Sequence, residues 1–172
     1  HNDIDLIVMG TKGATGLKKI VLGSNAAAVL NKSNIPVIVV PEFARFTNLK
    51  NIVYATDIAN LKDELKTVVS IAKDFNATVH ILHIITPAGE EKLDKKQTVA
   101  KLTKAMGYKK ITFTISLHDD AAEGIDQYVI KHKTDMLVMF THELTFLKKL
   151  FGQSVTREMA FLSNVPLLTF KK

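Results

Sequence analysis

The feature that most constrains the fold of this chain is an internal repeat. When residue n is placed against residue n + 130, residues 1–42 align with residues 131–172 without a gap. Twelve positions are identical, and many of the exchanges, such as Ile35/Val165 and Val37/Leu167, replace one apolar residue by another. The identical pairs are Asp5/Asp135, Val8/Val138, Met9/Met139, Thr11/Thr141, Thr15/Thr145, Leu17/Leu147, Lys18/Lys148, Lys19/Lys149, Ser24/Ser154, Ser33/Ser163, Asn34/Asn164 and Pro36/Pro166. Such self-similarity predicts that one structural unit occurs twice.

The two copies differ in what precedes them. A body of sequence from about Leu49 leads into the second repeat, whereas no matching body leads into the first. We therefore expect residues 1–41 to be the C-terminal part, strand–helix–strand, of a first domain. Residues 42–48 would be a linker and residues 49–172 a complete second domain. The offset then implies about 82 further residues before His1, because an orphaned strand–helix–strand cannot bury both faces of its sheet. The alternative is that His1 is a true mature end.

Strand and helix signals alternate through the second copy. β-branched apolar runs predict strands, and apolar residues at helical spacing predict helices. A helix N-cap is expected in His118-Asp-Asp120 and a helix stop at Gly107. Such alternation predicts an α/β fold, a five-stranded parallel sheet with helices on both faces. The expected strands are 51–56, 77–85, 111–117, 136–141 and 165–170, and the expected helices are 61–75, one ending near Met106, 121–132 and 146–162.

Glycines cluster where the first copy passes from strand to helix. Glycine directly after a buried parallel strand lets backbone N–H groups approach a ligand, and the start of a helix attracts anions. The pattern reads Gly10-x2-Gly13-x9-Gly23-Ser24-Asn25, and positive charge nearby comes from Lys12, Lys18 and Lys19. It predicts a cradle for phosphate oxygens. The alternative is that these are merely turn glycines.

This spacing resembles the nucleotide-binding signature of the universal stress protein family. Three other segments are similar to the family's opening strand with its terminal aspartate, its second strand and its last strand. They are Ile52-Val-Tyr-Ala-Thr-Asp57, Val79-His-Ile-Leu-His83-Ile and Ile35-Pro-Val-Ile-Val-Val-Pro41. The resemblance covers nearly the whole chain, as the closing part of one family domain and a complete second one.

The resemblance implies a Rossmann-like fold of the adenine-nucleotide alpha hydrolase-like type, with ATP as a bound ligand. It implies phosphate or ribose contacts at the glycine motif and a nucleoside contact at Asp57. Family domains commonly pair through their last strands, which implies a homodimer or a strand-exchanged assembly. The implied cofactor-binding residues are Gly10, Lys12, Gly13, Gly23, Ser24, Asn25 and Asp57.

The second copy departs from the signature. The alignment places Phe140 at Gly10 and Glu143 at Gly13. A phenyl ring would fill the space of a phosphate, and a carboxylate would repel it. We therefore expect ATP to bind at the first copy of an intact parent protein and poorly at the second copy. Because the first copy lacks its own counterpart of Asp57, these 172 residues alone should bind nucleotide weakly or not at all.

Composition excludes several classes of protein. The chain has 47% hydrophobic and 23% charged residues and no cysteine, which argues against disorder, disulfide scaffolds and thiolate metal sites. No apolar run approaches the roughly 20 residues of a membrane span, so we expect a cytoplasmic protein without membrane contact. The basic residues behind the net charge of +6 are interspersed with acidic residues and form no dense patch. Because the chain also has no tryptophan on which bases could stack, we do not expect it to bind nucleic acid.

Histidines and serines suggest no catalytic or metal site. His80 and His83 lie three apart on one expected strand, hence on opposite faces, so they cannot chelate one ion together. Asp119 and Asp120 fit a helix cap better than a cation site. Ser24 and Ser154 have no histidine placed beside them. We expect no catalytic residue and no metal.

The function favoured by the sequence is stress response through adenine-nucleotide binding at the first copy, with a degenerate second copy used in pairing or regulation. The alternative is a nucleotide-independent dimerisation or interaction module. Slow ATP hydrolysis is a third possibility for which no base is evident. The first copy's strands should lie against the second copy's last strand, or be completed by another chain.

Overall fold

The computed structural model describes residues 4–11, 24–45, 48–85, 94–141 and 164–171. The expected helix at 146–162 and the site residues Lys12, Gly13 and Gly23 lie outside these ranges. The chain forms two compact units: His1–Phe46 together with Met139–Lys172, called unit 1, and Thr47–Val138, called unit 2. The division falls within one strand, β6 (Met136–Thr141).

Unit 2 holds the core of the second copy. Its strands are β3 (Asn51–Ala55), β4 (Thr78–Ile85) and β5 (Ile111–Leu117), and its helices are α2 (Leu61–Phe75), α3 (Lys95–Met106) and α4 (Ala121–Lys131). β4 pairs in parallel with both β3 and β5. The strand order is β6-β3-β4-β5, in which β6 contributes the residues up to Val138. The α/β fold class is therefore confirmed.

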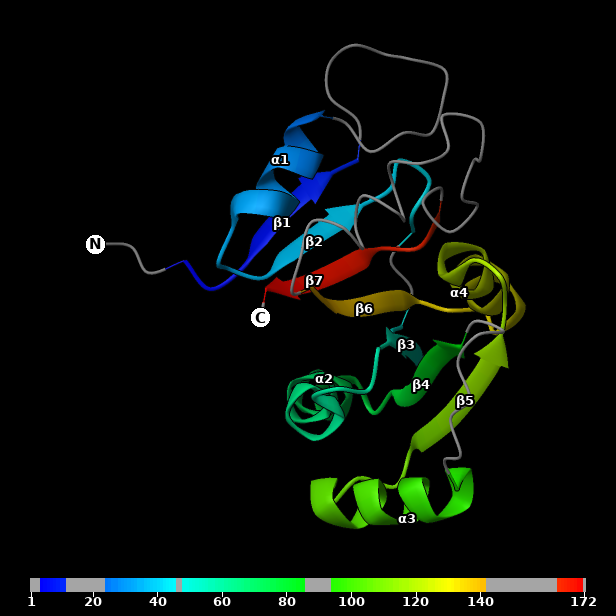
Figure 1. Cartoon of the computed structure of the whole chain (residues 1–172). Coiled ribbons are helices and arrows are strands. Elements are labelled where there is room, and N and C mark those ends of the chain that lie inside the picture. The colour runs from blue at the N-terminus through cyan, green and yellow to red at the C-terminus, as the bar shows by residue number, and fades with distance from the viewer. Residues whose placement is uncertain (1–3, 12–23, 46–47, 86–93, 142–163, 172) are drawn as a thin grey trace. The chain divides into compact units, whose positions relative to one another are not determined.

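The order of these strands reverses at β3. The chain moves from β3 outward to β5 and then returns through α4 to β6, on the other side of β3. Right-handed crossovers in opposite directions place their helices on opposite faces. Figure 1 shows this arrangement, with α2 and α3 on one side of β3–β5 and α4 on the other. Ligands of such sheets bind beyond the carboxyl ends of the strands beside this reversal.

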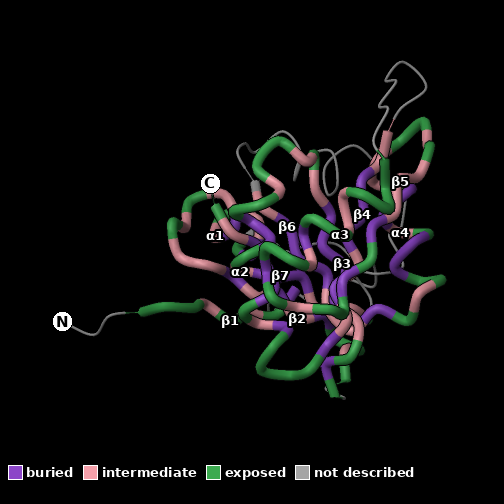
Figure 2. The backbone as a smooth tube through the Cα atoms, turned by 90° about the horizontal axis from the view of Figure 1, so that it is seen from below, coloured by how far each residue is buried: buried purple, intermediate pink, exposed green. Residues whose placement is uncertain are grey.

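The core of unit 2 lies along β3, β4 and the inner face of α2. The β-branched and aromatic residues of β3 are buried on both faces of the strand, as a parallel sheet covered on both sides requires. α2 buries a stripe of apolar residues at helical spacing, and the tube of Figure 2 shows buried segments along these elements. The fully buried residues include Ile52, Val53, Tyr54, Leu65, Val68, Ala72, Val79, Ile81 and Leu82.

Helix ends follow the predicted signals. The Asp120 side chain accepts hydrogen bonds from two backbone N–H groups of the first turn of α4, at 2.8 and 3.0 Å. α3 ends at Gly107, whose φ of 56° lies in the left-handed region that glycine adopts freely. Asp94 caps the start of α3 by accepting from the N–H of Gln97. Each cap satisfies backbone groups that a helix end leaves unpaired.

Unit 1 contains the first copy. β1 (Ile7–Gly10) pairs in parallel with β2 (Val37–Val40), and α1 (Ser24–Lys32) connects them. α1 packs on β2 through buried residues such as Ala26 and Leu30. The strand order is β1-β2-β7-β6, where β7 is Leu167–Lys171. The expected strand–helix–strand of residues 1–41 is thus present.

The last strands of the two copies pair with each other. β2 and β7 run antiparallel, with Val37 opposite Thr169 and Val39 opposite Leu167. The Thr169 hydroxyl donates to the Val37 carbonyl oxygen at 3.4 Å. The prediction that the first copy's strands lie against the second copy's last strand is therefore confirmed, and unit 1 has a mixed sheet.

Candidate functional site

The glycine motif of the first copy begins at the carboxyl end of β1. Gly10 is the last residue of that strand and is exposed. The next residue, Thr11, is buried, and its N–H donates to the Val40 carbonyl oxygen at 3.1 Å. This bond extends the β1–β2 ladder one residue beyond the strand. The motif thus starts from a fixed strand end at the edge where ligands of parallel sheets bind.

The same motif ends at the amino end of α1. Ser24 is the first residue of this helix, and Asn25 follows it with an exposed side chain. The first turn of α1 contains no acidic residue, whereas α2 carries Asp63 and Glu64 in its first turn. Unpaired N–H groups and the helix dipole make such an end favourable for an anion. The structure therefore describes the motif's strand end and helix end, but not the residues between them.

Asp57 lies just beyond the carboxyl end of β3 in unit 2. Its side chain is exposed and accepts a hydrogen bond from the N–H of Ala59 at 3.0 Å. Ile58 between them has φ of 64°, a conformation that β-branched residues rarely adopt. The Ile58 N–H donates to the Thr56 hydroxyl oxygen at 2.9 Å. Asp57 therefore sits on a defined turn, held by backbone-to-side-chain bonds on both sides.

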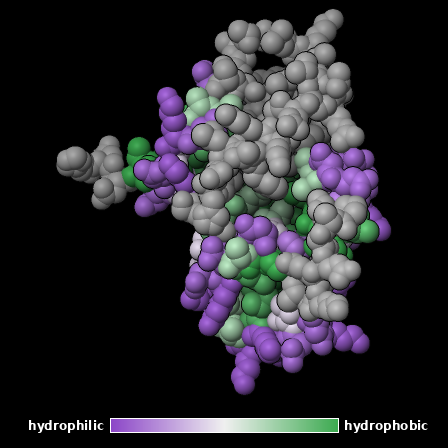
Figure 3. Space-filling view, viewed as in Figure 1, coloured by the Kyte–Doolittle hydropathy of each residue, from purple (hydrophilic) through white to green (hydrophobic). Residues whose placement is uncertain are grey.

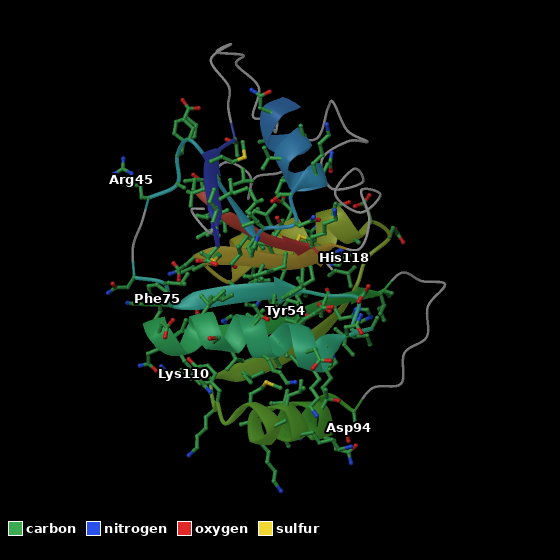
Figure 4. All side chains as sticks on the ribbon, turned by 90° about the vertical axis from the view of Figure 1, so that its left-hand side faces the viewer. Arg45, Tyr54, Phe75, Asp94, Lys110 and His118 are labelled. Carbon is green, nitrogen blue, oxygen red and sulfur yellow. The ribbon has the colours of Figure 1, made fainter. Side chains whose placement is uncertain are left out.

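A buried polar group that the sequence analysis did not identify supports this turn. Tyr54, on β3 beside α2 (Figure 4), donates its hydroxyl proton to the Glu64 carboxylate. The hydroxyls of Tyr54 and Thr56 are 3.0 Å apart. Burial and the bond to Glu64 raise the pKa of Tyr54. The signal in the sequence was Glu64 itself, an acidic residue within the apolar stripe of α2.

A histidine supports the same turn from the neighbouring strand. His83, on β4, is buried, and its Nδ1 lies 2.8 Å from the Thr56 carbonyl oxygen. Because a carbonyl only accepts, Nδ1 carries the proton in this contact. His80, three residues earlier, is half-buried, with its ring nitrogens near Asn51 Oδ1 at 3.2 Å and Thr112 Oγ1 at 3.0 Å. Both histidines are thus part of the packed sheet.

Phe140 occupies the second-copy position that corresponds to Gly10. Its ring stacks on Phe170 of β7, with centroids 4.7 Å apart and an interplanar angle of 14°. Stacked aromatic rings at this separation attract each other and fill the space between strands. The position that is open at Gly10 in the first copy is therefore occupied by an aromatic pair in the second.

Three further features concern metal ligands, membrane spans and surface charge in the described residues. In the ranges that the structure covers, no three His, Asp or Glu side chains are grouped so that they could hold a metal ion. Nor is any described helix long and apolar enough to cross a bilayer. α3 carries the exposed lysines Lys95, Lys96, Lys101 and Lys104, and Figure 3 shows hydrophilic surface at its lower end, where α3 lies in the same view of Figure 1.

Comparison with known proteins assigns the family. The sequence profile of the universal stress protein family matches residues 1–41 and 48–171. Two universal stress proteins of Methanocaldococcus jannaschii are 58% and 54% identical to this chain over 36 and 37 residues. These stretches cover 21% and 22% of the chain and 21% and 23% of the relatives. The chain thus matches about a fifth of the length of each relative.

Solved structures share the fold. A universal stress protein from Archaeoglobus fulgidus superposes with a TM-score of 0.70 at 22% identity, covering 98% of this chain and 61% of that one. A universal stress protein in complex with cAMP superposes with a TM-score of 0.51 at 17% identity, covering 72% of this chain and 97% of that one. The profile match extends over most of the sequence, so this chain belongs to the universal stress protein family.

Proposed function

We propose that this chain acts in stress response by binding an adenine nucleotide, ATP, through the glycine motif of its first copy. The phosphates would lie between the end of β1 at Gly10 and the start of α1 at Ser24 and Asn25. Lys12, Gly13 and Gly23 would complete the cradle. Asp57 would contact the nucleoside end of a site in the second copy.

The observation that carries this proposal is the pairing of an exposed strand-end glycine with a helix start free of acidic residues. Gly10 and the first turn of α1 belong to one strand–helix–strand in unit 1. An anion near the first turn of a helix is stabilised by about 0.3–1 kcal/mol from the dipole alone, and lysine adds to this attraction. The cAMP complex of a related protein supports an adenine nucleotide as the ligand class.

The second copy is proposed to serve in pairing or regulation and to bind nucleotide poorly. The Phe140–Phe170 stack supports this view, because a phosphate at that position would have to displace a packed ring. The β2–β7 pairing supports a role of the last strands in association. A homodimer, a cytoplasmic location and the lack of efficient catalysis remain proposals that accompany this function.

A nucleotide-independent interaction module is the competing function. The observation in its favour is the same β2–β7 pairing, which joins the two copies without any ligand. It predicts normal folding and association together with no response to nucleotide.

Competition with a fluorescent ATP analogue distinguishes the two functions. We expect weak binding that ATP displaces and that Lys12→Ala reduces roughly tenfold, because a charge-assisted contact is worth about 1.5–3 kcal/mol. Lys109→Ala removes the same charge from an exposed position in unit 2 and is the matched control. Equal affinity of both variants, or no displacement by ATP, would favour the interaction module.

A further inference from the structure

A strained loop joins α4 to β6 in unit 2. It consists of residues 132–135 and is called the α4–β6 loop. Lys133 has φ of 49°, in the left-handed region that residues with a Cβ rarely adopt. The Thr134 hydroxyl is buried and has no hydrogen-bond partner among the residues that the structure describes. Opening the loop would relieve the backbone strain and give this hydroxyl water as a partner.

The contacts that keep this loop closed come from β3 and from α4. The Asn51 side chain donates from Nδ2 to the Lys133 carbonyl oxygen at 3.5 Å. The Asp135 carboxylate accepts from the Asn51 N–H at 2.7 Å. The Thr134 N–H donates to the Val129 carbonyl oxygen at 3.3 Å. The loop is therefore bonded on one side to the start of β3 and on the other to the last turn of α4.

His80 of β4 orients the Asn51 amide. Asn51 Oδ1 lies 3.2 Å from His80 Nε2. Because an amide oxygen only accepts, Nε2 carries the proton. In the neutral ring Nδ1 then accepts from the Thr112 hydroxyl, whose oxygen is 3.0 Å away. The neutral ring thus completes a chain of hydrogen bonds that runs from β5 through β4 and β3 to the α4–β6 loop.

A second histidine stands at the start of the loop. The ring centroids of His132 and His80 are 6.3 Å apart. His132 stacks on Tyr128 with centroids 3.7 Å apart, and its Nδ1 lies 2.8 Å from the Tyr128 carbonyl oxygen. Positive charges on both histidines would repel each other at this separation. Burial, together with His132, lowers the pKa of His80.

The other charged groups around His80 do not offset this effect. Those that flank it on β3, β5, α4 and the loop are Lys50, Lys110, Asp126, Lys131, Lys133 and Asp135. The Asp135 carboxylate is bonded to the N–H groups of Lys50 and Asn51. The Lys110 ammonium donates to the Asn76 carbonyl oxygen at 2.8 Å. In the described part of the chain the printed partners of His80 are Asn51 and Thr112, so a proton on this ring gains no bonded carboxylate.

We propose that His80, Asn51 and His132 form a proton-operated latch on the α4–β6 loop. With His80 neutral, the chain of hydrogen bonds holds the loop closed. A proton on His80 places a charge in a half-buried position beside His132, so the ring turns toward solvent and releases Asn51. The strained loop then opens and frees the last turn of α4 and the start of β6. This response to acid is independent of nucleotide binding.

Hydrogen exchange of the full 172-residue chain, followed by NMR at about pH 7.5 and about pH 5.5, tests the latch. Rates are divided by those of an unstructured peptide at the same pH. We expect the protection of the Thr134 amide to fall roughly tenfold at the lower pH, the effect of about one pH unit below a titrating group.

The end of α2 supplies a matched control within the same unit. There Asn76 has φ of 53°, and the Ala77 N–H donates to the Ala72 carbonyl oxygen at 2.9 Å. This turn repeats the geometry of Lys133 and Thr134, but its printed side-chain partners are Tyr108 and Lys110 rather than a histidine. The protection of the Ala77 amide should therefore change little between the two pH values.

Variants separate the parts of the latch. His80→Gln should remove the pH dependence at Thr134, and Asn51→Ala should leave that amide poorly protected at both pH values. His132→Gln removes the repelling charge, so the loop should open at a higher pH. His118→Gln changes a histidine outside these contacts and should leave the response intact.

Three results would overturn the proposal. One is an equal loss of protection at Thr134 and Ala77, which would indicate general acid destabilisation. Another is a pH dependence that survives His80→Gln. The third needs no variant: in the unmodified chain, the His80 ring resonances and the Thr134 amide must titrate with the same midpoint, and different midpoints would refute the latch even if a variant failed to fold.

Discussion

Asp135 and Asn51 are joined by two hydrogen bonds across neighbouring strands of unit 2. The Asn51 N–H donates to the Asp135 carboxylate at 2.7 Å, and the Asp135 N–H donates to the Asn51 carbonyl oxygen at 2.9 Å. The same carboxylate also accepts from the Lys50 N–H at 2.8 Å. One side chain thus fixes where β3 begins relative to β6.

Replacing Asp135 by alanine should therefore destabilise unit 2. Two backbone N–H groups would lose a charged acceptor, at a cost of about 1.5–3 kcal/mol. Urea unfolding followed by circular dichroism measures this change. Asp74→Ala, at an exposed position of α2, is the matched control and should change the free energy of unfolding by less than about 0.5 kcal/mol. Equal effects of the two variants would contradict this role of Asp135.

Tyr54 and Glu64 should be energetically coupled. Both are buried, and the Tyr54 hydroxyl donates to the Glu64 carboxylate. Tyr54→Phe alone should cost about 1–3 kcal/mol, because it leaves a buried acceptor without that donor. In a double-mutant cycle with Glu64→Leu, the second change should recover part of this loss, with a coupling of about 1 kcal/mol or more. Additive losses would mean that the pair contributes nothing as a pair.

His80 should make unfolding sensitive to acid. Burial, together with the nearby His132, lowers the pKa of His80, so the folded protein keeps this ring neutral. The unfolded chain binds a proton near the ordinary pKa of about 6.5. The unfolded state then holds more protons, and the free energy of unfolding falls as pH drops below about 6.5. Denaturant titrations from pH 8 to 5 should show this slope, and His80→Gln should flatten it. An NMR titration that places the pKa of His80 at or above 6.5 would refute the prediction.

Gly124 should resist replacement by alanine. A Cβ there would lie 2.8 Å from His118 Cδ2 and 3.0 Å from Ile84 Cδ1. Replacing glycine by alanine within a helix normally stabilises the protein by about 1 kcal/mol. A loss of stability in Gly124→Ala would therefore indicate a steric clash of the new Cβ. We expect Gly124→Ala to lower the melting temperature and the double variant Gly124→Ala/His118→Ala to restore part of the loss. A single variant more stable than the parent chain would show that the His118 ring moves aside freely.

Local patterns predicted most elements of this fold. β3, β5 and α2 lie where β-branched runs and helical spacing place them, and Gly107 and Asp120 end and begin helices as expected. These features depend on residues close in sequence. The repeat also predicted that the last strands meet, because each copy ends in an apolar edge.

Long-range polar contacts were not predictable in the same way. The support of Asp57 combines Tyr54 and Thr56 with Glu64 from α2 and His83 from β4. No rule of sequence spacing predicts contacts between residues on different elements. Ile58 could not be predicted either, because β-branched residues rarely adopt its left-handed backbone conformation. Of the seven residues implied to contact the nucleotide, the structure describes Gly10 at the strand end, Ser24 and Asn25 at the helix start, and Asp57 on its turn. Their roles in binding remain predictions.

The most direct test of the proposed function is an NMR titration of the isotopically labelled chain with ATP, which detects weak binding residue by residue. We expect the shifts of the Gly10 and Asn25 amides to saturate together, Gly10→Val to abolish them, and the Phe140 and Phe170 resonances to change little. Unchanged Gly10 and Asn25 amides at millimolar ATP, or shifts centred on Asp57 and Phe140, would contradict the assignment of the nucleotide to the first copy.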